Sequence, residues 1–366
     1  MHLKSNPSKR VVLHVGMLKT GTTSLQIFLQ RNKKALEEKG IGYYIPQHEE
    51  YTPTSNAGFL CWSSLFEIRG NESQRSKYDK EIASFCNYAR LYDTLILSEE
   101  FLSELGTEIP GYWETIKQNI KRMTGEQTQI DVVIFIRRQD DWAYSRWKQQ
   151  VLNSFFYDNQ NIPETSDFSD FLNSLRIKTL MDYDGVLQQI TKVFGRDHLI
   201  VCGYDNKQKS SFDTVETFFT ATGITPSGFE IEKTINANPS ITMRAVKALL
   251  LLNQSKDIAT ISRNNIYHGA QTFSGLYPDE HTYYPISKKQ RNELLSIFDS
   301  SNEHISFIYN KGIPFFSRDT EQFYVWEDDP EQTRQDADTI LKLSTLSRET
   351  AIFLLKNAHD AAKKTH

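Results

Sequence analysis

The sequence has few cysteines, no long apolar run and no excess of positive charge. Its three cysteines lie far apart and form neither a C-x-x-C pair nor a ligand set with histidines, so we expect free thiols and no metal site. No stretch approaches ~18 consecutive apolar residues, so no membrane span is expected. The net charge of −4 argues against a protein that binds nucleic acid through a broad basic surface.

What is present is the composition of an ordinary globular protein, with 39% apolar and 24% charged residues. The 366 residues exceed a typical domain, yet α/β folds of this size often form one globule, so we predict a single domain over 1–366. The polar segment 1–10 passes directly into the first predicted strand, with no apolar signal sequence before it. We therefore expect a cytoplasmic protein, and the sequence leaves its oligomeric state open.

The most informative stretch is 11–28, VVLHVGMLKTGTTSLQIF, which combines a strand, a glycine loop and the start of a helix. Residues 11–15 form the apolar, β-branched run of a strand buried on both faces. Gly16 and Gly21 permit a tight turn and a close approach of the backbone to a ligand. The helix that follows directs its unpaired N–H groups and its dipole at the same place, which favours an anion. The stretch therefore predicts a phosphate-binding loop.

The two glycines match the triphosphate-binding pattern G-x-x-x-x-G-K-[ST], but Thr22 occupies the position of the lysine. The lysine is Lys19, inside the loop, where it would reach the near side of a 5′-phosphate. The stretch resembles the 5′-phosphosulfate loop of sulfotransferases that use 3′-phosphoadenosine 5′-phosphosulfate (PAPS), whose core is K-[ST]-G-T-[ST]. The resemblance implies PAPS as co-substrate, adenosine 3′,5′-bisphosphate as product, and no metal. The residues that it implies for binding PAPS here are Lys19, Thr20, Gly21, Thr22, Thr23 and Ser24.

Strands alternate with helices through 11–223, which predicts an α/β fold of the phosphate-loop kind, with a parallel sheet flanked by helices. The predicted strands are 11–15, 41–45, 94–97, 129–136 and 198–202. The predicted helices in this part are 23–38, 77–92, 108–123, 139–156, 168–194 and 211–222. Residues 224–366 form a mainly helical C-terminal extension, with helices over 241–253 and 288–300. In a parallel sheet of this kind, ligands bind at the carboxyl ends of the strands.

A second anion-binding stretch begins where the strand 129–136 ends, in the sequence IRRQDDWAYS. Arg137 at the strand end and Ser145, about two turns into the next helix, can converge on one anion. The stretch resembles the 3′-phosphate signature of sulfotransferases, an arginine followed by a serine eight positions later. Arg138 and Gln139 stand where many members have Asn-Pro, and we expect the Arg138 side chain to be solvated.

The strand 198–202 is followed by Tyr204, and LIVCGYDN resembles the family's strand that ends in a tyrosine beside adenine. The resemblance implies that Tyr204 contacts adenine. Cytosolic members also stack adenine on an aromatic residue directly after the paired hydroxyls of the loop, but this chain has Ser24 there. The residue that stacks on adenine therefore stays open.

For the catalytic base, Glu99 is preferred over Glu100 and His48. Glu99 follows the strand 94–97, so it would lie at the carboxyl edge of the sheet with the loop and Arg137. The sequence S-E-E resembles the S-S-E stretch of bacterial, carbohydrate-type members. A partly desolvated carboxylate can have its pKa raised towards neutrality and still accept a proton. Lys19 is the expected electrostatic catalyst on the bridging oxygen, where negative charge develops.

The acceptor is expected to be a carbohydrate or glycoconjugate. Tyr- and Trp-bearing polar segments at 48–62, 155–163 and 264–285, interpreted as loops, suit a sugar because they combine aromatic faces with hydrogen-bonding groups. They would equally suit a phenol or simple packing.

Two other functions stay open. A kinase of the related fold requires a lysine at position 22 and an aspartate that holds Mg²⁺, for which Asp140 and Asp141 are candidates, although these are expected to face solvent or cap the helix. A non-catalytic nucleotide-binding module requires a degraded loop, or no carboxylate near it.

Overall fold

The computed structural model describes most of the chain as two compact units. Unit 1 comprises Met1–Arg138, Lys178–Ala237 and Phe298–Ser317, and unit 2 comprises Gln139–Ile177, Asn238–Ile297 and Arg318–His366. Whether the two form one domain over 1–366 stays a prediction. The described residues are 9–47, 55–154, 166–204, 211–225, 228–229, 240–254, 263–279, 281–317, 323–347, 350–352 and 354–355.

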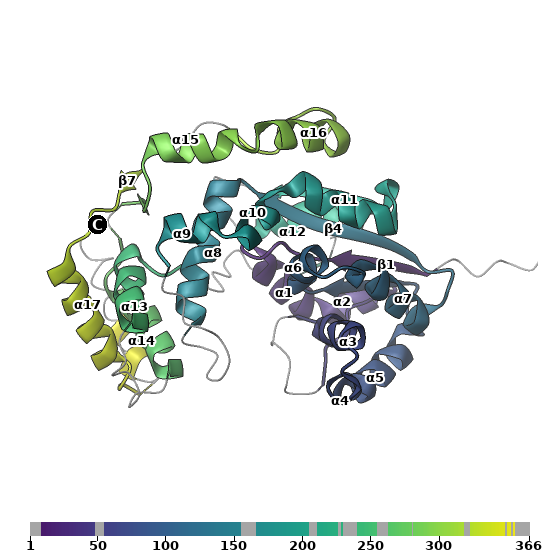
Figure 1. Ribbon diagram of the computed structural model, residues 1–366. Helices are drawn as coiled ribbons and strands as arrows, with labels where there is room; N and C mark the ends of the chain where they lie inside the picture. Colours follow the sequence, from purple (N-terminus) through teal and green to yellow (C-terminus); the bar gives the residue numbers. More distant parts are fainter. Residues whose placement is uncertain are drawn as a thin grey trace, which may run out of the picture. The chain divides into compact units, whose positions relative to one another are not determined.

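Unit 1 is built on a five-stranded parallel sheet in the order β2-β3-β1-β4-β5. The predicted α/β fold with a parallel sheet is therefore confirmed (Figure 1). The central strand β1 pairs with β3 on one side and β4 on the other, which places the carboxyl ends of all three at one edge. The strands are β1 (Arg10–His14), β2 (Ile41–Gly42), β3 (Thr94–Ser98), β4 (Gln129–Arg137) and β5 (Leu199–Tyr204).

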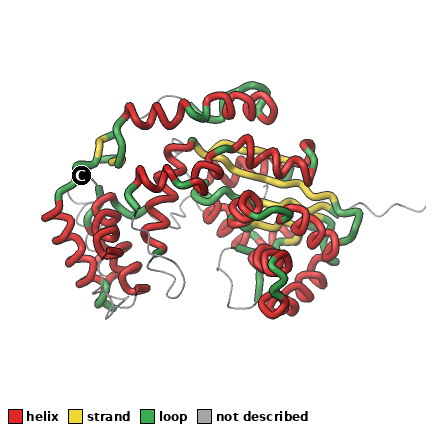
Figure 2. The backbone as a smooth tube through the Cα atoms, in the orientation of Figure 1, coloured by secondary structure: helices red, strands yellow, loops and turns green. Residues whose placement is uncertain are grey.

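Helices cover both faces of this sheet, because successive side chains of a strand point to opposite faces. Val12 on β1 belongs to a buried cluster with residues of α1 (Thr22–Arg31) and α12 (Ser211–Thr222). Its neighbours Val11 and Leu13 are also fully buried and face the opposite side, where α11 (Tyr183–Phe194) contacts β4 and β5. Figure 2 shows the strands in yellow with helices in red on either side.

The remaining helices of unit 1 lie in the connections between strands of the sheet, except α16, which follows the last of these strands in the chain. They are α2 (Lys33–Glu37), α3 (Gly58–Ile68), α4 (Glu72–Arg75), α5 (Asp79–Ala89), α6 (Phe101–Glu108), α7 (Tyr112–Thr124) and α16 (Asp299–Tyr309). The helix α10 (Leu175–Met181) crosses the boundary between the units.

Unit 2 is mainly helical. It differs in extent from the C-terminal part predicted over 224–366, because it includes Gln139–Ile177 and excludes Phe298–Ser317. Its helices are α8 (Gln139–Asn153), α9 (Phe168–Asn173), α13 (Met243–Gln254), α14 (Arg263–Leu276), α15 (Lys288–Ser296) and α17 (Pro330–Leu343). It also contains a small parallel pair of strands that was not predicted, β6 (Tyr283–Tyr284) and β7 (Tyr324–Val325).

Some predicted elements are interrupted. The helix predicted over 23–38 divides at Asn32, whose side-chain amide donates to the Phe28 carbonyl at 3.0 Å. The helix predicted over 168–194 is three helices. The first ends at Ser174, whose backbone is extended and whose Oγ accepts from Ile177 N at 3.3 Å, and Asp182 accepts from Gly185 N at 3.3 Å and caps the start of the third. The strand predicted over 41–45 extends only over Ile41–Gly42.

Two segments interpreted as loops contain helices, so those interpretations were wrong. In 48–62, helix α3 begins at Gly58. In 264–285, helix α14 runs to Leu276 and buries Ile266, Ala270 and Phe273, which are four and three positions apart and so share one helix face. The polar residues between them concealed this periodicity. The third aromatic segment, 155–163, lies outside the described residues.

Candidate functional site

The loop between β1 and α1 is held on both sides by backbone contacts at the carboxyl edge of the sheet. On the β4 side, Val15 N donates to Val133 O at 3.0 Å and Phe135 N donates to Gly16 O at 2.7 Å. On the β3 side, a Cβ at Gly16 would lie 2.9 Å from the carbonyl oxygen of Glu100. Only glycine fits at this position, since its φ of 101° is also unfavourable for other residues.

Lys19 adopts a left-handed backbone conformation, with φ of 66°. This conformation is uncommon for a residue with a side chain and persists where the surroundings determine it. Here Arg137 supplies such a contact, because its Nη1 donates to the Lys19 carbonyl at 3.1 Å. The two anion-binding stretches predicted from the sequence are therefore in direct contact within unit 1.

Helix α1 begins immediately after this loop, and its own first turn contains no acidic residue. Its N-cap is Gly21, with φ of 78°, and no side chain caps it or places a carboxylate in its first turn. The N–H of Ser24 donates to the Gly21 carbonyl at 3.1 Å. The earlier N–H groups of the first turn and the positive end of the helix dipole are directed at the loop, the arrangement that binds anions.

Two hydroxyls of the loop already have acceptors. Thr20 is fully buried and donates to the Met17 carbonyl at 2.6 Å, which supports the turn. Thr22 donates to the carboxylate of Glu100. Thr23 and Ser24 lie half-buried on the first turn of α1.

Arg137 and Tyr204 are paired at the ends of β4 and β5. The guanidinium carbon of Arg137 lies 5.5 Å from the centroid of the Tyr204 ring. A Cβ at Gly21 would lie 2.9 Å from Tyr204 Cε2, so the tyrosine ring packs directly against the loop. Arg137 Nε is buried and has no hydrogen-bond partner in the described part of the chain. The structure thus brings Lys19, Gly21, Arg137 and Tyr204 together, and their roles stay predictions.

Two predicted residues are not brought into this group. Ser145 lies on α8 in unit 2, and its convergence with Arg137 on one anion stays a prediction. His48 lies outside the described residues. Arg138, expected to be solvated, donates from Nη1 to the Ser317 carbonyl at 3.4 Å.

The two adjacent carboxyls, Glu99 and Glu100, point to different surroundings. Glu99 is 2% exposed and accepts from Ser55 Oγ and, at 3.1 Å, from Phe101 N. Burial raises the pKa of Glu99 to about 7, although these hydrogen bonds partly oppose the rise. Glu100 instead contacts the loop through Thr22.

A buried polar group beneath the loop was missed by sequence reasoning. His14 Nδ1 lies 2.8 Å from Ser98 Oγ, which also accepts from Gln26 Nε2 at 3.1 Å. Burial lowers the pKa of His14 to about 3, so its ring is neutral, and Nε2 has no partner among the described residues. The group links β1, β3 and α1, the three elements that converge at the loop. The one available signal was a histidine inside the apolar run VVLHV.

The buried Glu99 predicts a pH-dependent stability. Its pKa is about 7 in the folded protein and 4.5 in the reference state, so the folded state binds more protons between these values and loses stability as the pH rises. Glu99→Gln removes the ionisable carboxyl and with it this dependence of stability on pH. We therefore expect the free energy of unfolding of the variant, relative to the native protein, to increase by about 3 kcal/mol from pH 4.5 to 7.

Urea denaturation at several pH values measures this difference, in which contributions from other groups cancel. Glu108→Gln, which removes an exposed carboxyl from the neighbouring helix α6, is the matched control. A difference that is independent of pH for Glu99→Gln would contradict the burial of an ionisable carboxyl there.

The two aspartates considered as Mg²⁺ ligands do not face solvent, so that part of the expectation was wrong, and both lie in the first turn of α8. Asp140 is 1% exposed and accepts from Nε of the buried Arg291 at 2.7 Å. Asp141 accepts from Arg291 at 3.2 Å and from the Tyr284 hydroxyl. Both carboxylates are thus committed to an ion-pair cluster within unit 2.

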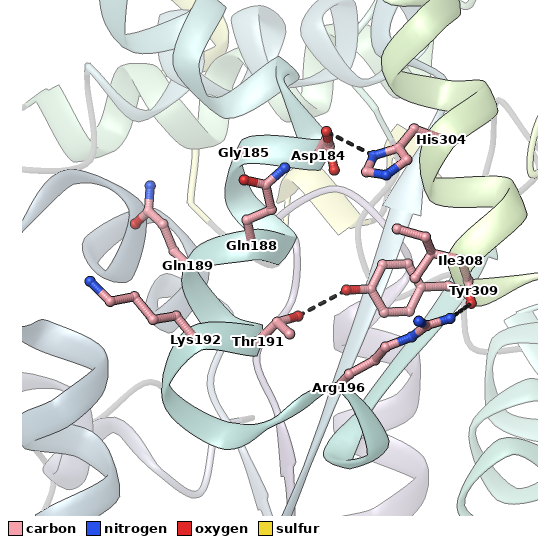
Figure 3. Close-up of a pocket in the computed structure, with 10 residues that line it drawn as sticks. All are labelled: Asp184, Gly185, Gln188, Gln189, Thr191, Lys192, Arg196, His304, Ile308 and Tyr309. Atoms are coloured by element: carbon pink, nitrogen blue, oxygen red, sulfur yellow. Dashed lines mark hydrogen bonds and ion pairs between the residues drawn. The ribbon is translucent and has the colours of Figure 1, made fainter.

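A separate hollow of about 560 Å³ lies between α11 and α16 in unit 1 (Figure 3). Asp184 pairs with His304 at 3.0 Å at one end, and Thr191 and Tyr309 share a hydrogen bond of 2.8 Å further along. None of the predicted site residues lines it. The polar contacts hold α16 against α11, and we assign the hollow no part in the candidate site.

The described residues also bear on the predictions that the protein has no metal site and no membrane span. Among them, no group of three or more His, Cys, Asp or Glu side chains is arranged to hold a metal ion. No helix in the described part of the chain has the length and apolarity needed to cross a membrane.

Comparison with solved structures finds a sulfotransferase from Alicyclobacillus acidocaldarius, known from a crystal structure. It is 15% identical to this chain, the TM-score is 0.37, and the alignment covers 72% of this chain and 96% of that one. No family model matches the sequence, and neither does any curated protein. A likeness at this TM-score carries no functional argument, so the function has to be argued from the site residues.

Proposed function

We propose that the protein is a sulfotransferase that transfers the sulfuryl group from PAPS to a hydroxyl or amine of a carbohydrate or glycoconjugate. The observation that carries the proposal is the hydrogen bond from Arg137 to the Lys19 carbonyl. Lys19 and Arg137 are 118 positions apart in the sequence, and the bond joins the two stretches that resemble the 5′- and 3′-phosphate signatures of the family.

The residues present fit a nucleotide that carries two separate phosphates. The N–H groups of residues 20–23 and the dipole of α1 would hold the 5′-phosphate, because no side chain caps α1 and its own first turn contains no acidic residue. The N–H of Ser24 already donates to the Gly21 carbonyl at 3.1 Å, and the Glu100 carboxylate contacts the start of the helix at the Thr22 hydroxyl. Arg137 would hold the 3′-phosphate, and its buried, unpartnered Nε is a donor that such an anion would satisfy. Tyr204, packed beside Gly21 and Arg137, would contact adenine.

The proposed chemistry needs positive charge at the leaving group and a base for the acceptor. The acceptor oxygen or nitrogen attacks sulfur, the bond from sulfur to the bridging oxygen breaks, and the acceptor proton passes to the base. Lys19 stabilises the charge that develops on the bridging oxygen. Its left-handed backbone, bonded to Arg137, fixes where the side chain leaves the loop.

For the base, the contacts favour Glu100 over Glu99, the reverse of the order expected from the sequence. Glu100 reaches the loop through Thr22, whereas Glu99 is buried against Ser55 and Phe101. We therefore propose Glu100 as the base. Glu99 would act as a positioning residue, since its bond to Phe101 N lies at the start of α6, beside Glu100.

The alternatives have less support. A kinase lacks the lysine at position 22, and its candidate Mg²⁺ ligands, Asp140 and Asp141, are committed to Arg291 and Tyr284. A catalytically silent module is disfavoured because the loop retains Lys19 and has the carboxylate of Glu100 in contact with it.

Binding of adenosine 3′,5′-bisphosphate tests the proposed donor site. We expect tighter binding than for AMP, because only the bisphosphate carries the 3′-phosphate that Arg137 would hold. Arg137→Ala should remove most of this preference, at a cost of about 1.5–3 kcal/mol for the loss of a charge-assisted hydrogen bond. Isothermal titration calorimetry measures both affinities.

The matched control is Arg138→Ala, which removes the adjacent guanidinium while leaving Arg137 on the Lys19 carbonyl. The control should keep the preference for the bisphosphate. Equal affinity of the native protein for AMP and the bisphosphate would overturn the assignment of the 3′-phosphate site.

A further inference from the structure

Unit 2 presents a group of aromatic rings around the small β6–β7 pair. The strands run parallel, with Tyr283 opposite Tyr324, and are joined by bonds of 3.0 Å from Tyr324 N to Thr282 O and 2.8 Å from Trp326 N to Tyr284 O. We call the rings of His281, Tyr283, Tyr324 and Trp326 the aromatic platform.

The four rings are in contact with one another. His281 stacks on Tyr324 with centroids 4.1 Å apart and an interplanar angle of 21°. Tyr283 meets Tyr324 at 6.1 Å and Trp326 edge-on at 5.3 Å. Tyr324 is 51% exposed, so the platform is accessible on the described surface of unit 2.

Tyr284, the next residue on β6, is buried and anchors the platform. Its ring lies 4.5 Å from that of Tyr144 and 3.9 Å from the guanidinium of Arg291, and its hydroxyl donates to Asp141. Arg291 is in turn paired with the buried Asp140. Because these partners lie on α8 and α15, the platform is preorganised by buried contacts within unit 2.

The platform combines apolar ring faces with polar groups at the surface. The hydroxyl of Tyr324 is carried by a ring that is 51% exposed, and His281 is exposed beside it, whereas the indole N–H of Trp326 is buried. Three acidic residues follow it, Glu327, Asp328 and Asp329, of which Asp328 is paired with Lys247 at 2.7 Å. Ring faces suit the C–H surface of a pyranose, and polar groups suit its hydroxyls. The negative charges of Glu327 and Asp329 disfavour a polyanion, whereas the charge of Asp328 is offset by Lys247.

We propose that the aromatic platform binds an uncharged oligosaccharide. This proposal deepens the proposed function. It rests on that function for one point, that the bound oligosaccharide is the acceptor of the sulfuryl group. Its test, however, measures saccharide binding in the absence of PAPS and of any turnover. The saccharide-binding proposal and the proposed sulfotransferase function can therefore fail separately.

The test is calorimetric titration of the full chain with three hexasaccharides, one of glucose, one of N-acetylglucosamine and one of galacturonate. We expect binding of at least one uncharged chain and none of the polyuronate. Tyr324→Ala should weaken binding about tenfold, the scale of an aromatic contact at the centre of an interface, whereas Tyr324→Phe should keep it. Phe307→Ala, at a 77% exposed ring on α16, is the matched control and should not change it.

Unchanged binding by Tyr324→Ala, or preferential binding of the polyuronate, would overturn the proposal. A third outcome would also overturn it: the native chain binds no saccharide, and Tyr324→Ala changes the oligomeric state. The platform would then be a contact between two copies of this chain. Thermal unfolding of each variant identifies loss of fold, and Tyr324→Phe keeps the test valid if the alanine variant unfolds. If the saccharide binds but a separate assay with PAPS shows no sulfuryl transfer, the saccharide-binding proposal stands and only the proposed function is refuted.

Discussion

Glu100→Gln is expected to lower the turnover number for sulfuryl transfer by about 10²–10⁴-fold, the usual contribution of a general base. The glutamine retains an oxygen that can accept from Thr22, so the loop contact is preserved while the proton acceptor is lost. Affinity for adenosine 3′,5′-bisphosphate should therefore change little. Transfer of radiolabelled sulfate from PAPS, with nucleotide affinity measured alongside, gives both quantities.

Glu99→Gln is the matched comparison, because it makes the same substitution at the adjacent residue. We expect a smaller loss of turnover, since Glu99 is 2% exposed and touches Ser55 and Phe101 instead of the loop. If Glu99→Gln lost the larger factor, the order expected from the sequence would be right and the assignment to Glu100 wrong. If His48→Ala alone abolished turnover, neither carboxyl would be the base.

Lys19→Ala is expected to lower turnover by about 10²–10³-fold, the scale of removing one donor that stabilises developing charge. The loop itself should remain folded. Alanine meets the same steric conditions at φ of 66° as lysine does, and the carbonyl that Arg137 binds belongs to the backbone. The measurement is again transfer from PAPS, performed in excess EDTA, in which we expect the native protein to stay active.

Two further variants separate charge from backbone strain. Lys19→Gly relieves the left-handed conformation but should lose as much turnover as alanine, because both lack the ammonium. Lys34→Ala removes an exposed lysine of α2 and should keep native turnover. Full activity of Lys19→Ala would refute the electrostatic role, and a strict Mg²⁺ requirement with consumption of ATP would support the kinase alternative.

The strands that carry the site could be predicted because strands buried on both faces leave continuous apolar runs in the sequence. The predictions 94–97 and 129–136 agree with β3 and β4 to within a residue at each end. Helices were less predictable, because side chains decide where they divide. Asn32 bonds back to Phe28, and Asp182 caps a new helix, and neither contact changes the hydrophobic periodicity.

The sequence by itself determined the residue types and spacing of the loop, since a turn between a strand and a helix depends on neighbours along the chain. Gly16, Lys19 and Gly21 occur within six positions and needed no distant partner to be noticed. Only the tertiary structure decided that Arg137 reaches the Lys19 carbonyl and that Glu100, not Glu99, meets Thr22. Those contacts follow from the pairing of β1 with β3 and β4, and no local pattern encodes which strands lie side by side or in what register.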